Sequence, residues 1–266
     1  MDRTDLERYR EWFTGYAESF YSDDYEERRH AALKIKHTFN VCEAASAVAD
    51  GEAVGAGTKL LAGAAALFHD VGRFSQYAQY RTFRDAISIN HGKLGADILR
   101  SERVLAGLPE NEQEIIINAV RFHNAFAIPA LQSEEQTLVL KLVRDADKLD
   151  IWPIFLGLFE GPEEDRIPEA GLGLPELPFY SEEAVQSIRR GEIVANASLK
   201  TINDFRLLQL SWAYDLNFNT SVRLMLEGNY IDRLVAQLPK DDEIAGVTRI
   251  IKKYACDRLS AAAAVA

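Results

Sequence analysis

Cysteine is nearly absent from this chain of 266 residues, which contains only Cys42 and Cys256. Two cysteines provide neither a disulfide framework nor a metal site built from thiolates alone. Their scarcity suits a reducing compartment, and the charged N-terminal stretch "MDRTDLERYREWF" lacks the apolar core of a secretion signal. We therefore expect the protein to reside in the cytoplasm.

Long apolar runs and an excess of positive charge are also missing. The longest apolar run, "LLAGAAALF" at residues 60–68, is far shorter than the roughly 20 residues that a membrane helix needs. The chain has 30 Lys and Arg residues against 41 Asp and Glu residues, a net charge of -11. Since long nucleic acids are bound through clustered Lys and Arg, we expect no nucleic acid polymer and no membrane as partners. A small anionic ligand stays compatible with this charge, because a metal can reverse the local field.

Alternation of apolar and polar residues, the mark of a half-buried strand, is lacking between residues 5 and 160, where apolar residues recur at helical spacing instead. The sequence therefore predicts an all-α protein. With boundaries uncertain by roughly 2–4 residues, we expect helices at 5–21, 24–49, 57–70, 88–104, 111–126, 134–158, 181–190, 198–237 (broken once or twice) and 241–262. No flexible polar linker divides the chain, so we expect a single domain over residues 1–266.

Residues 160–183 are the exception to this helical pattern, because they hold four of the eight prolines and show no helical period. We expect an insertion loop here, either a functional loop or a variable surface segment. After it, residues 195–262 predict a C-terminal helical layer. The aromatic residues of "SWAYDLNF" in this layer are best explained by core packing, and a homodimer interface is the second explanation.

Histidine is scarce, and four of the five histidines lie on the apolar stripes of predicted helices. A single histidine on such a stripe is usually a core residue with its hydrogen bonds satisfied. Here four separate helices each direct one imidazole inward, so the set carries more information than any member. These residues are His37, His69, His91 and His123. His30 lies two turns before His37, and we expect it at the surface or behind the ligands.

Carboxylates accompany these imidazoles. Asp70 follows His69 directly in "LFHDVGRF", and Asp147 lies on an inward stripe with Val143, whereas Asp145 shares a face with Lys141 and Lys148. Burying four imidazoles and two carboxylates is costly when they are satisfied by hydrogen bonds alone. A divalent metal removes that cost, because neutral imidazole and ionised carboxylate are both good ligands for first-row ions. The set therefore predicts a metal site.

In this order the ligands resemble those of the HD superfamily of metal-dependent phosphohydrolases. The resemblance covers roughly residues 25–155 and implies an HD-domain, phosphodiesterase-like helical bundle, here with extra C-terminal helices. It implies that one metal is held by His37, His69, Asp70 and Asp147. It also implies a second metal at His91 and His123, with Asp70 bridging the two. The ligand set does not choose among Fe, Mn, Co, Ni, Zn and Mg.

The chain departs from some branches of this superfamily. His123 is followed by "NAFAIP", without the "GYP" and the histidine pair of cyclic-dinucleotide phosphodiesterases, so that branch is disfavoured. Arg73 follows "HDVG" where many members have lysine. An arginine offers a planar fork for two phosphate oxygens.

We therefore expect a metal-dependent phosphohydrolase that cleaves a phosphate ester or anhydride of a small, nucleotide-like molecule. Two metals about 3.5–4 Å apart can generate a metal-bound hydroxide at neutral pH and clamp a phosphate oxygen. Asp70 is expected to orient this nucleophile, Arg73 to contact phosphate and Lys148 to neutralise charge at the rim. Weaker candidates for phosphate contact are Arg81, Arg84 and Arg144. Asn124 is expected to orient a ligand or to cap a helix.

A second hypothesis belongs to another reaction class. Inositol oxygenase has this fold and the same four-histidine, two-aspartate set, but holds two irons and activates oxygen. The metal ligands alone do not separate the two activities. A ligand-binding module that has lost catalysis is disfavoured, because such a module has no physical reason to keep all six ligands.

Overall fold

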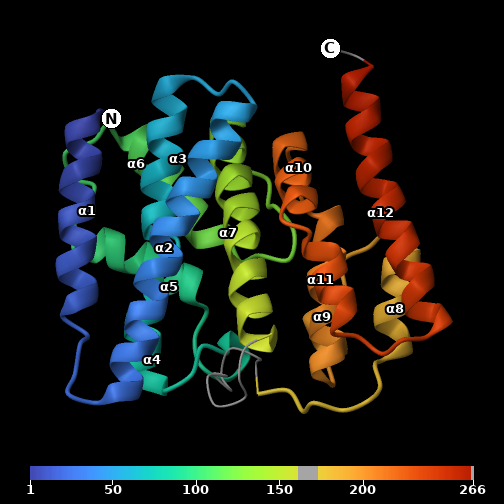
Figure 1. Ribbon diagram of the computed structural model, residues 1–266. Helices are drawn as coiled ribbons and strands as arrows, with labels where there is room; N and C mark the ends of the chain where they lie inside the picture. Colours follow the sequence, from blue (N-terminus) through green and yellow to red (C-terminus); the bar gives the residue numbers. More distant parts are fainter. Residues whose placement is uncertain (161–172, 265–266) are drawn as a thin grey trace. The chain divides into compact units, whose positions relative to one another are not determined.

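The computed structural model describes residues 1–160 and 173–264 (Figure 1). Within these residues it contains helices and turns and no β-strand, so the all-α prediction is confirmed. The chain divides into two compact units, Met1–Asp150 and Ile151–Ala266. The expectation of a single domain stays a prediction. None of the described helices combines the length and the apolar character that a membrane crossing requires.

The first unit is a bundle of helices in which α2 packs on α3, α3 on α6, and α5 on both α4 and α6. Its buried core includes Phe13, Val41, Leu67, Ile116 and Leu140. The helices are α1 (Arg3–Glu18), α2 (Tyr25–Gly51), α3 (Ala56–Phe68), α4 (Gly72–Tyr80), α5 (His91–Ser101), α6 (Glu110–Phe122) and the first part of α7 (Glu134–Glu160), with a 3-10 turn η1 at Asp85–Ile87.

Side chains fix where two of these helices begin. The Asp24 carboxylate accepts a hydrogen bond from the Glu27 amide at the start of α2, and the Asn90 side chain accepts one from the Lys93 amide at the start of α5. Such caps satisfy amides that have no partner within the helix. Asn90 therefore fixes the start of the helix whose first residue is His91.

Helix α4 was not expected from the sequence. Its residues, "GRFSQYAQY", begin with glycine and include serine and two glutamines, so they give no clear apolar stripe. Tertiary contacts explain the helix instead. Phe74 is buried, and the Gln76 amide donates hydrogen bonds of 2.9 Å to Asp85, to Ser88 and to the Ile89 carbonyl.

The second unit holds the end of α7 and five further helices, in which α8 packs on α9 and α12, and α11 packs on α9 and α12. The predicted helix at 198–237 is divided into α9 (Ile202–Ser211), η4 (Trp212–Tyr214), α10 (Asn219–Glu227) and α11 (Tyr230–Ala236). The remaining elements are α8 (Glu182–Arg189), η3 (Asn196–Ser198) and α12 (Asp242–Ala263). Of the predicted loop at 160–183, residues 161–172 lie outside the described part of the chain.

The aromatic residues of "SWAYDLNF" contribute to packing in this unit. Trp212 lies 5.8 Å from Trp152, centroid to centroid, and Tyr214 lies 4.8 Å from Tyr254. The Tyr214 hydroxyl donates to the Ile188 carbonyl at 3.0 Å. These contacts are consistent with the prediction that the aromatic residues pack in the core. The alternative, a homodimer interface, stays a prediction.

Candidate metal centre

The six predicted ligands come from four helices and one turn of the first unit. His37 lies in the middle of α2, His91 is the first residue of α5, and His123 follows the end of α6. His69 and Asp70 occupy the turn between α3 and α4, and Asp147 lies on α7. The four histidines and Asp70 are buried. The structure therefore brings together residues that are up to 110 positions apart in the sequence.

The histidine rings form two pairs whose Nε2 atoms converge. The Nε2 atoms of His37 and His69 lie 3.2 Å apart, and those of His91 and His123 lie 3.0 Å apart. Asp147 joins the first pair, with Oδ1 at 3.1 Å from His37 Nε2 and 3.6 Å from His69 Nε2. We call the group of His37, His69 and Asp147 the first cluster and the group of His91 and His123 the second cluster.

Asp70 lies between the clusters and presents one carboxylate oxygen to each. Its Oδ2 is 3.6 Å from His37 Nε2 and 3.7 Å from His69 Nε2. Its Oδ1 is 3.3 Å from His91 Nε2 and 3.8 Å from His123 Nε2. Asp70 therefore completes two groups of donor atoms close enough to hold metal ions, one with His37 and His69 and one with His91 and His123.

A close approach of α4 and α5 brings His91 to Asp70. A Cβ added at Gly72 would lie 2.3 Å from the His91 carbonyl oxygen and 2.7 Å from the Gly95 amide nitrogen. Only glycine fits at this crossing of two backbones. The glycine in "HDVGR" therefore sets how near the second cluster lies to the first.

The other ring nitrogen of each histidine has a partner of its own. His69 Nδ1 lies 2.7 Å from the Ala66 carbonyl, and His123 Nδ1 lies 2.8 Å from the Val120 carbonyl. A carbonyl oxygen only accepts, so both Nδ1 atoms carry the proton, and the neutral rings direct their Nε2 lone pairs at the clusters.

Carboxylates hold the remaining two rings. His37 Nδ1 lies 2.7 Å from Asp150 Oδ2, and His91 Nδ1 lies 2.7 Å from Asp85 Oδ2. The Asn124 amide donates to the same Asp85 oxygen at 2.9 Å. A carboxylate behind a histidine is the arrangement that orients imidazole ligands in metal sites.

Burial and neighbouring charges set the protonation of these groups. Burial, together with His91 and His69, lowers the pKa of His123 to about 3. Burial also lowers the pKa of His37, but its hydrogen bonds with Asp147 and Asp150 outweigh burial and raise the pKa to about 9. Burial raises the pKa of Asp70, yet the charges of Lys34 and His69 outweigh burial and keep this pKa well below its usual value. The centre therefore contains ionised carboxylates and a firmly neutral His123.

The chemistry of this donor set fits divalent metal ions. Two neutral imidazoles that point their lone pairs at each other across 3.0 Å repel, and the carboxylate between the clusters adds negative charge. A cation between these donors converts the repulsion into ligation, and imidazole with carboxylate suits first-row divalent ions. The residues present therefore match the metal that their order in the sequence implies.

Two cations lie beside Asp70. Lys34 Nζ is 2.7 Å from Asp70 Oδ2, and Arg73 Nε is 3.4 Å from Asp70 Oδ1. Arg73 also donates from a terminal nitrogen to Asp85 at 3.0 Å and to Gln76 at 2.9 Å. Arg73, which the sequence predicts to contact phosphate, thus lies beside Asp70, and its role stays a prediction. Lys34 is a second cation at Asp70 and was not predicted.

The other cations named from the sequence have different surroundings. Lys148 is buried, and its Nζ donates to the Arg144 carbonyl at 3.3 Å. Arg144 is buried too and donates to the His123 carbonyl at 3.1 Å and to the Ala125 carbonyl. Arg144 thus holds the backbone just after α6 in place through hydrogen bonds. Arg81 forms an ion pair with Glu27, and Arg84 is exposed in the loop before η1.

Three residues that contact the ligands were missed from the sequence. Lys34 precedes His37 by three positions and Asp150 follows Asp147 by three, so helical spacing was a usable signal for both. Asp85 begins the 3-10 turn η1, which is too short for any periodicity to mark it. His30, expected at the surface or behind the ligands, is buried, and its ring lies 4.5 Å from that of Tyr77.

The structure corrects the prediction for Asp145. The sequence predicts Asp145 on a polar face with Lys141 and Lys148, but Asp145 is fully buried, whereas the Asp147 side chain is 18% exposed. Burial therefore does not distinguish the two acids. The distances to His37 and His69 do, since they place Asp147 at the first cluster.

Comparison with known proteins gives one match. The family model described as HD domain matches residues 35–152, a segment that contains all six predicted ligands. Neither a curated protein nor a solved structure gives a significant match to the chain.

Proposed function

Because residues 35–152 form a domain of the HD family, which belongs to a superfamily of metal-dependent phosphohydrolases, we propose that this protein hydrolyses a phosphate ester or anhydride of a small molecule at a centre of two divalent metals. One observation carries the proposal: Asp70 presents Oδ2 to the first cluster and Oδ1 to the second. A carboxylate in this position suits a bridge between two ions.

The ligand assignment follows the two clusters. His37, His69 and Asp147 would hold one ion, His91 and His123 the other, and Asp70 both. When bound, two divalent ions lower the pKa of a water molecule, draw charge from phosphate oxygens and stabilise the leaving group. Asp85 and Asp150 keep the rings of His91 and His37 in place for this ligation.

The reaction breaks the bond between phosphorus and the leaving oxygen. The oxygen of a water molecule forms the new bond to phosphorus, and a proton of that water ends on the leaving oxygen. Lys34 and Arg73 would bind the phosphate oxygens, because both cations lie within 3.4 Å of Asp70. Asp70 orients the water, and Lys148 contributes positive charge nearby.

The expected substrate is small and anionic. A net charge of -11 repels a long polyanion, whereas the cations beside Asp70 attract a single phosphate group. We therefore propose a small phosphorylated substrate, nucleotide-like, and neither a nucleic acid polymer nor a membrane as a partner.

A phosphate-release screen over nucleotides and small phosphate esters tests the proposal. The protein is purified without oxygen, its metals are identified, and the screen is run with that metal in excess. We expect release by the wild type and by Asp97→Asn, an exposed carboxylate on α5, and none by Asp70→Asn. Turnover that consumes oxygen, requires iron and releases no phosphate would instead support the oxygenase hypothesis.

A further inference from the structure

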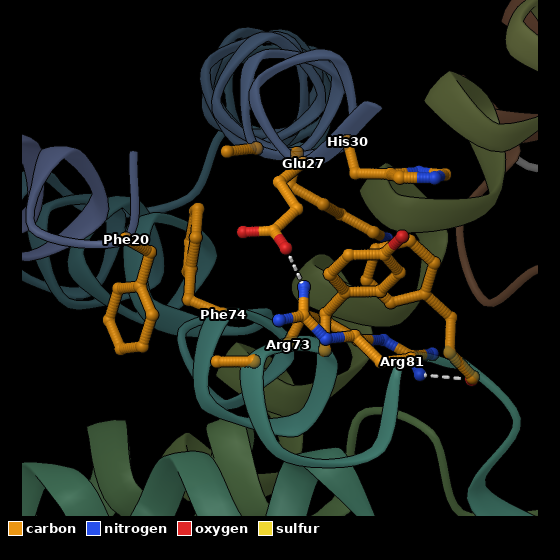
Figure 2. A pocket seen from close by; sticks show the side chains of 11 residues that line it. Phe20, Glu27, His30, Arg73, Phe74 and Arg81 are labelled. Atoms are coloured by element: carbon orange, nitrogen blue, oxygen red, sulfur yellow. Dashed lines mark hydrogen bonds and ion pairs between the residues drawn. The ribbon is translucent and has the colours of Figure 1, made fainter. Parts of the chain in front are cut away.

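A cavity adjoins the metal centre on the side formed by α2, α4 and the loop before η1 (Figure 2). Lys34 and Arg73, the two cations that contact Asp70, are also part of its lining. A substrate whose phosphate lies at Asp70 therefore has its leaving group either inside this cavity or outside it. The residues that line the cavity indicate whether the leaving group would bind there.

Aromatic rings make up much of the wall. Tyr77 and Phe83 stack with centroids 4.9 Å apart, and His30 lies 4.5 Å from Tyr77. The rings of Phe20 and Phe74, 5.9 Å apart, also line the cavity. Figure 2 shows these two phenylalanines on one side of Glu27 and His30 on the other. Flat apolar surfaces of this kind favour a flat ring as ligand, since rings gain from stacked and edge-on contacts.

The charges of the lining favour an anion. It contains three cations, Lys34, Arg73 and Arg81, and one carboxylate, Glu27. Lys34 Nζ is 5.3 Å and the Arg73 guanidinium carbon 5.9 Å from the centre of the Phe83 ring. Phe83 thus lies beside both phosphate-binding cations and next to Tyr77, which makes it the link between the charged and the aromatic parts of the cavity.

Arg81 and Glu27 provide the polar part of the lining on the exposed side. They form an ion pair, and their side chains are 58% and 25% exposed. The Arg81 guanidinium lies 6.0 Å from the Tyr77 ring centre, so a planar cation and a ring already pack there. Exposed ion pairs contribute little to stability, so a ligand ring can displace Arg81 from Tyr77 or stack on its guanidinium.

We propose that this cavity binds the leaving group of the substrate, and that the preferred substrate is a phosphate monoester whose alcohol carries a flat aromatic ring. The inference rests on the proposed function and adds where the leaving group of the substrate binds and which residues select it. Tyr77 and Phe83 determine specificity by contacting the ring, while Lys34 and Arg73 hold the phosphate.

Adenosine 5′-monophosphate and ribose 5-phosphate form a matched pair for the test. Both carry phosphate on the same primary alcohol of ribose, and only the first carries an aromatic ring system in the leaving group. Stacking of a base on aromatic side chains is favourable. We therefore expect kcat/KM of the metal-loaded protein to be at least about 10-fold higher for adenosine 5′-monophosphate than for ribose 5-phosphate.

Three variants locate the source of that ratio. Phe83→Leu and Tyr77→Leu each remove a ring from the cavity, and we expect either to reduce the ratio at least about fivefold. Phe179→Leu makes the same change at an exposed phenylalanine of the second unit, and we expect it to keep the wild-type ratio. Thermal unfolding checks that each variant is folded. If one of the two cavity variants does not fold, the other still tests the inference.

The outcomes separate this inference from the proposed function. A wild-type ratio near one, or a ratio that neither cavity variant changes, overturns the inference while any phosphate release upholds the function. Absence of release from every compound in the screen overturns the function. In that case, calorimetric titration of the same proteins with both compounds tests the inference. If wild type binds adenosine 5′-monophosphate more tightly than ribose 5-phosphate and Phe83→Leu removes this difference, the inference is supported. Equal or undetectable binding of the two compounds overturns it.

Discussion

Asp85 shows how much of the candidate metal centre depends on residues that are not predicted ligands. Its Oδ2 contacts His91 Nδ1, and its Oδ1 accepts hydrogen bonds from Arg73 and Gln76. Burial raises the pKa of Asp85, but its hydrogen bond with His91 and the charges of His91 and Arg73 together outweigh burial and lower the pKa to about 2. An ionised Asp85 therefore fixes both a proposed ligand and a proposed phosphate contact.

Replacing this carboxylate should weaken the second cluster. Asp85→Asn keeps the shape but loses the charge that orients His91, and outer partners of this kind are typically worth 10–100-fold in metal affinity or activity, so we expect a loss of about that size. Metal titration and phosphate release measure it. Asp97→Asn on α5 is the control, and equal metal affinity in the two variants would refute the role of Asp85.

The two cysteines should differ in reactivity. Burial raises the pKa of the Cys42 thiol to about 12 from an ordinary 9.0, whereas Cys256 is exposed. We expect iodoacetamide at pH 8 to label Cys256 and to leave Cys42 unmodified until the protein unfolds, because the thiolate is the reacting species. Mass spectrometry of the digested protein locates the label, and rapid labelling of Cys42 in the folded protein would contradict the assignment.

The same shift makes stability depend on pH. The unfolded chain releases the Cys42 proton near pH 9 and the folded chain only near pH 12. The contribution of the partly buried neutral thiol is therefore complete below about pH 9 and declines as the pH rises toward 12. Wild type should lose more stability over this range than Cys42→Ala.

At the scale of helices, the crossing of α4 and α5 carries a prediction of its own. A Cβ at residue 72 meets backbone atoms of His91 and Gly95 at less than 3 Å, and backbone cannot rotate away as a side chain does. We expect Gly72→Ala to lower the free energy of unfolding by about 1–3 kcal/mol and to reduce metal content at the second cluster.

Denaturant unfolding and metal analysis check both effects. Gly246→Ala is the control, because a Cβ there meets nothing within 4 Å and the residue lies inside α12. Alanine in a helix is favoured over glycine by roughly 0.5–1 kcal/mol, so this variant should be as stable as wild type or more stable. A Gly72→Ala protein with normal stability and normal metal content would refute the close approach.

Helices with a clear apolar stripe could be predicted from the sequence, and those held by tertiary contacts could not. The expected helix at 57–70 corresponds to α3 at Ala56–Phe68, whereas α4 depends on the hydrogen bonds of Gln76 to Asp85 and Ile89 in the segment that follows it. The expected helix at 198–237 is interrupted at residues 215–218, which are not helical, and again at residues 228–229, where Asn229 has a positive φ of 52°.

The same distinction holds within the site. Inward stripes led to His37, His91 and His123, which are buried as the stripes require. Asp85 begins the three-residue turn η1, whose position depends on the finished fold, so no pattern in the sequence indicated it. Lys34 carried a helical signal, but a lysine near a helix surface is usually solvated, and only its distance of 2.7 Å from Asp70 singles it out.

For the molecule as a whole, the centre connects α2, α5, α6, α7 and the turn after α3. Ions that bind the folded state but not the unfolded chain stabilise the folded state. The free energy of unfolding rises with the logarithm of the ion concentration divided by Kd, by about 2.7 kcal/mol at 100 times Kd. We expect the chelated protein to have a lower Tm than the loaded protein, measured by calorimetry. An unchanged Tm after verified metal removal would contradict this.

Metal content of protein purified without oxygen tests the central claim most directly, with wild type and His91→Ala compared by elemental analysis per chain. His91 belongs to the second cluster alone, and its ring contacts the Oδ1 side of Asp70. The two-metal account predicts about two ions in wild type and about one in His91→Ala. Equal content in the two proteins would contradict it.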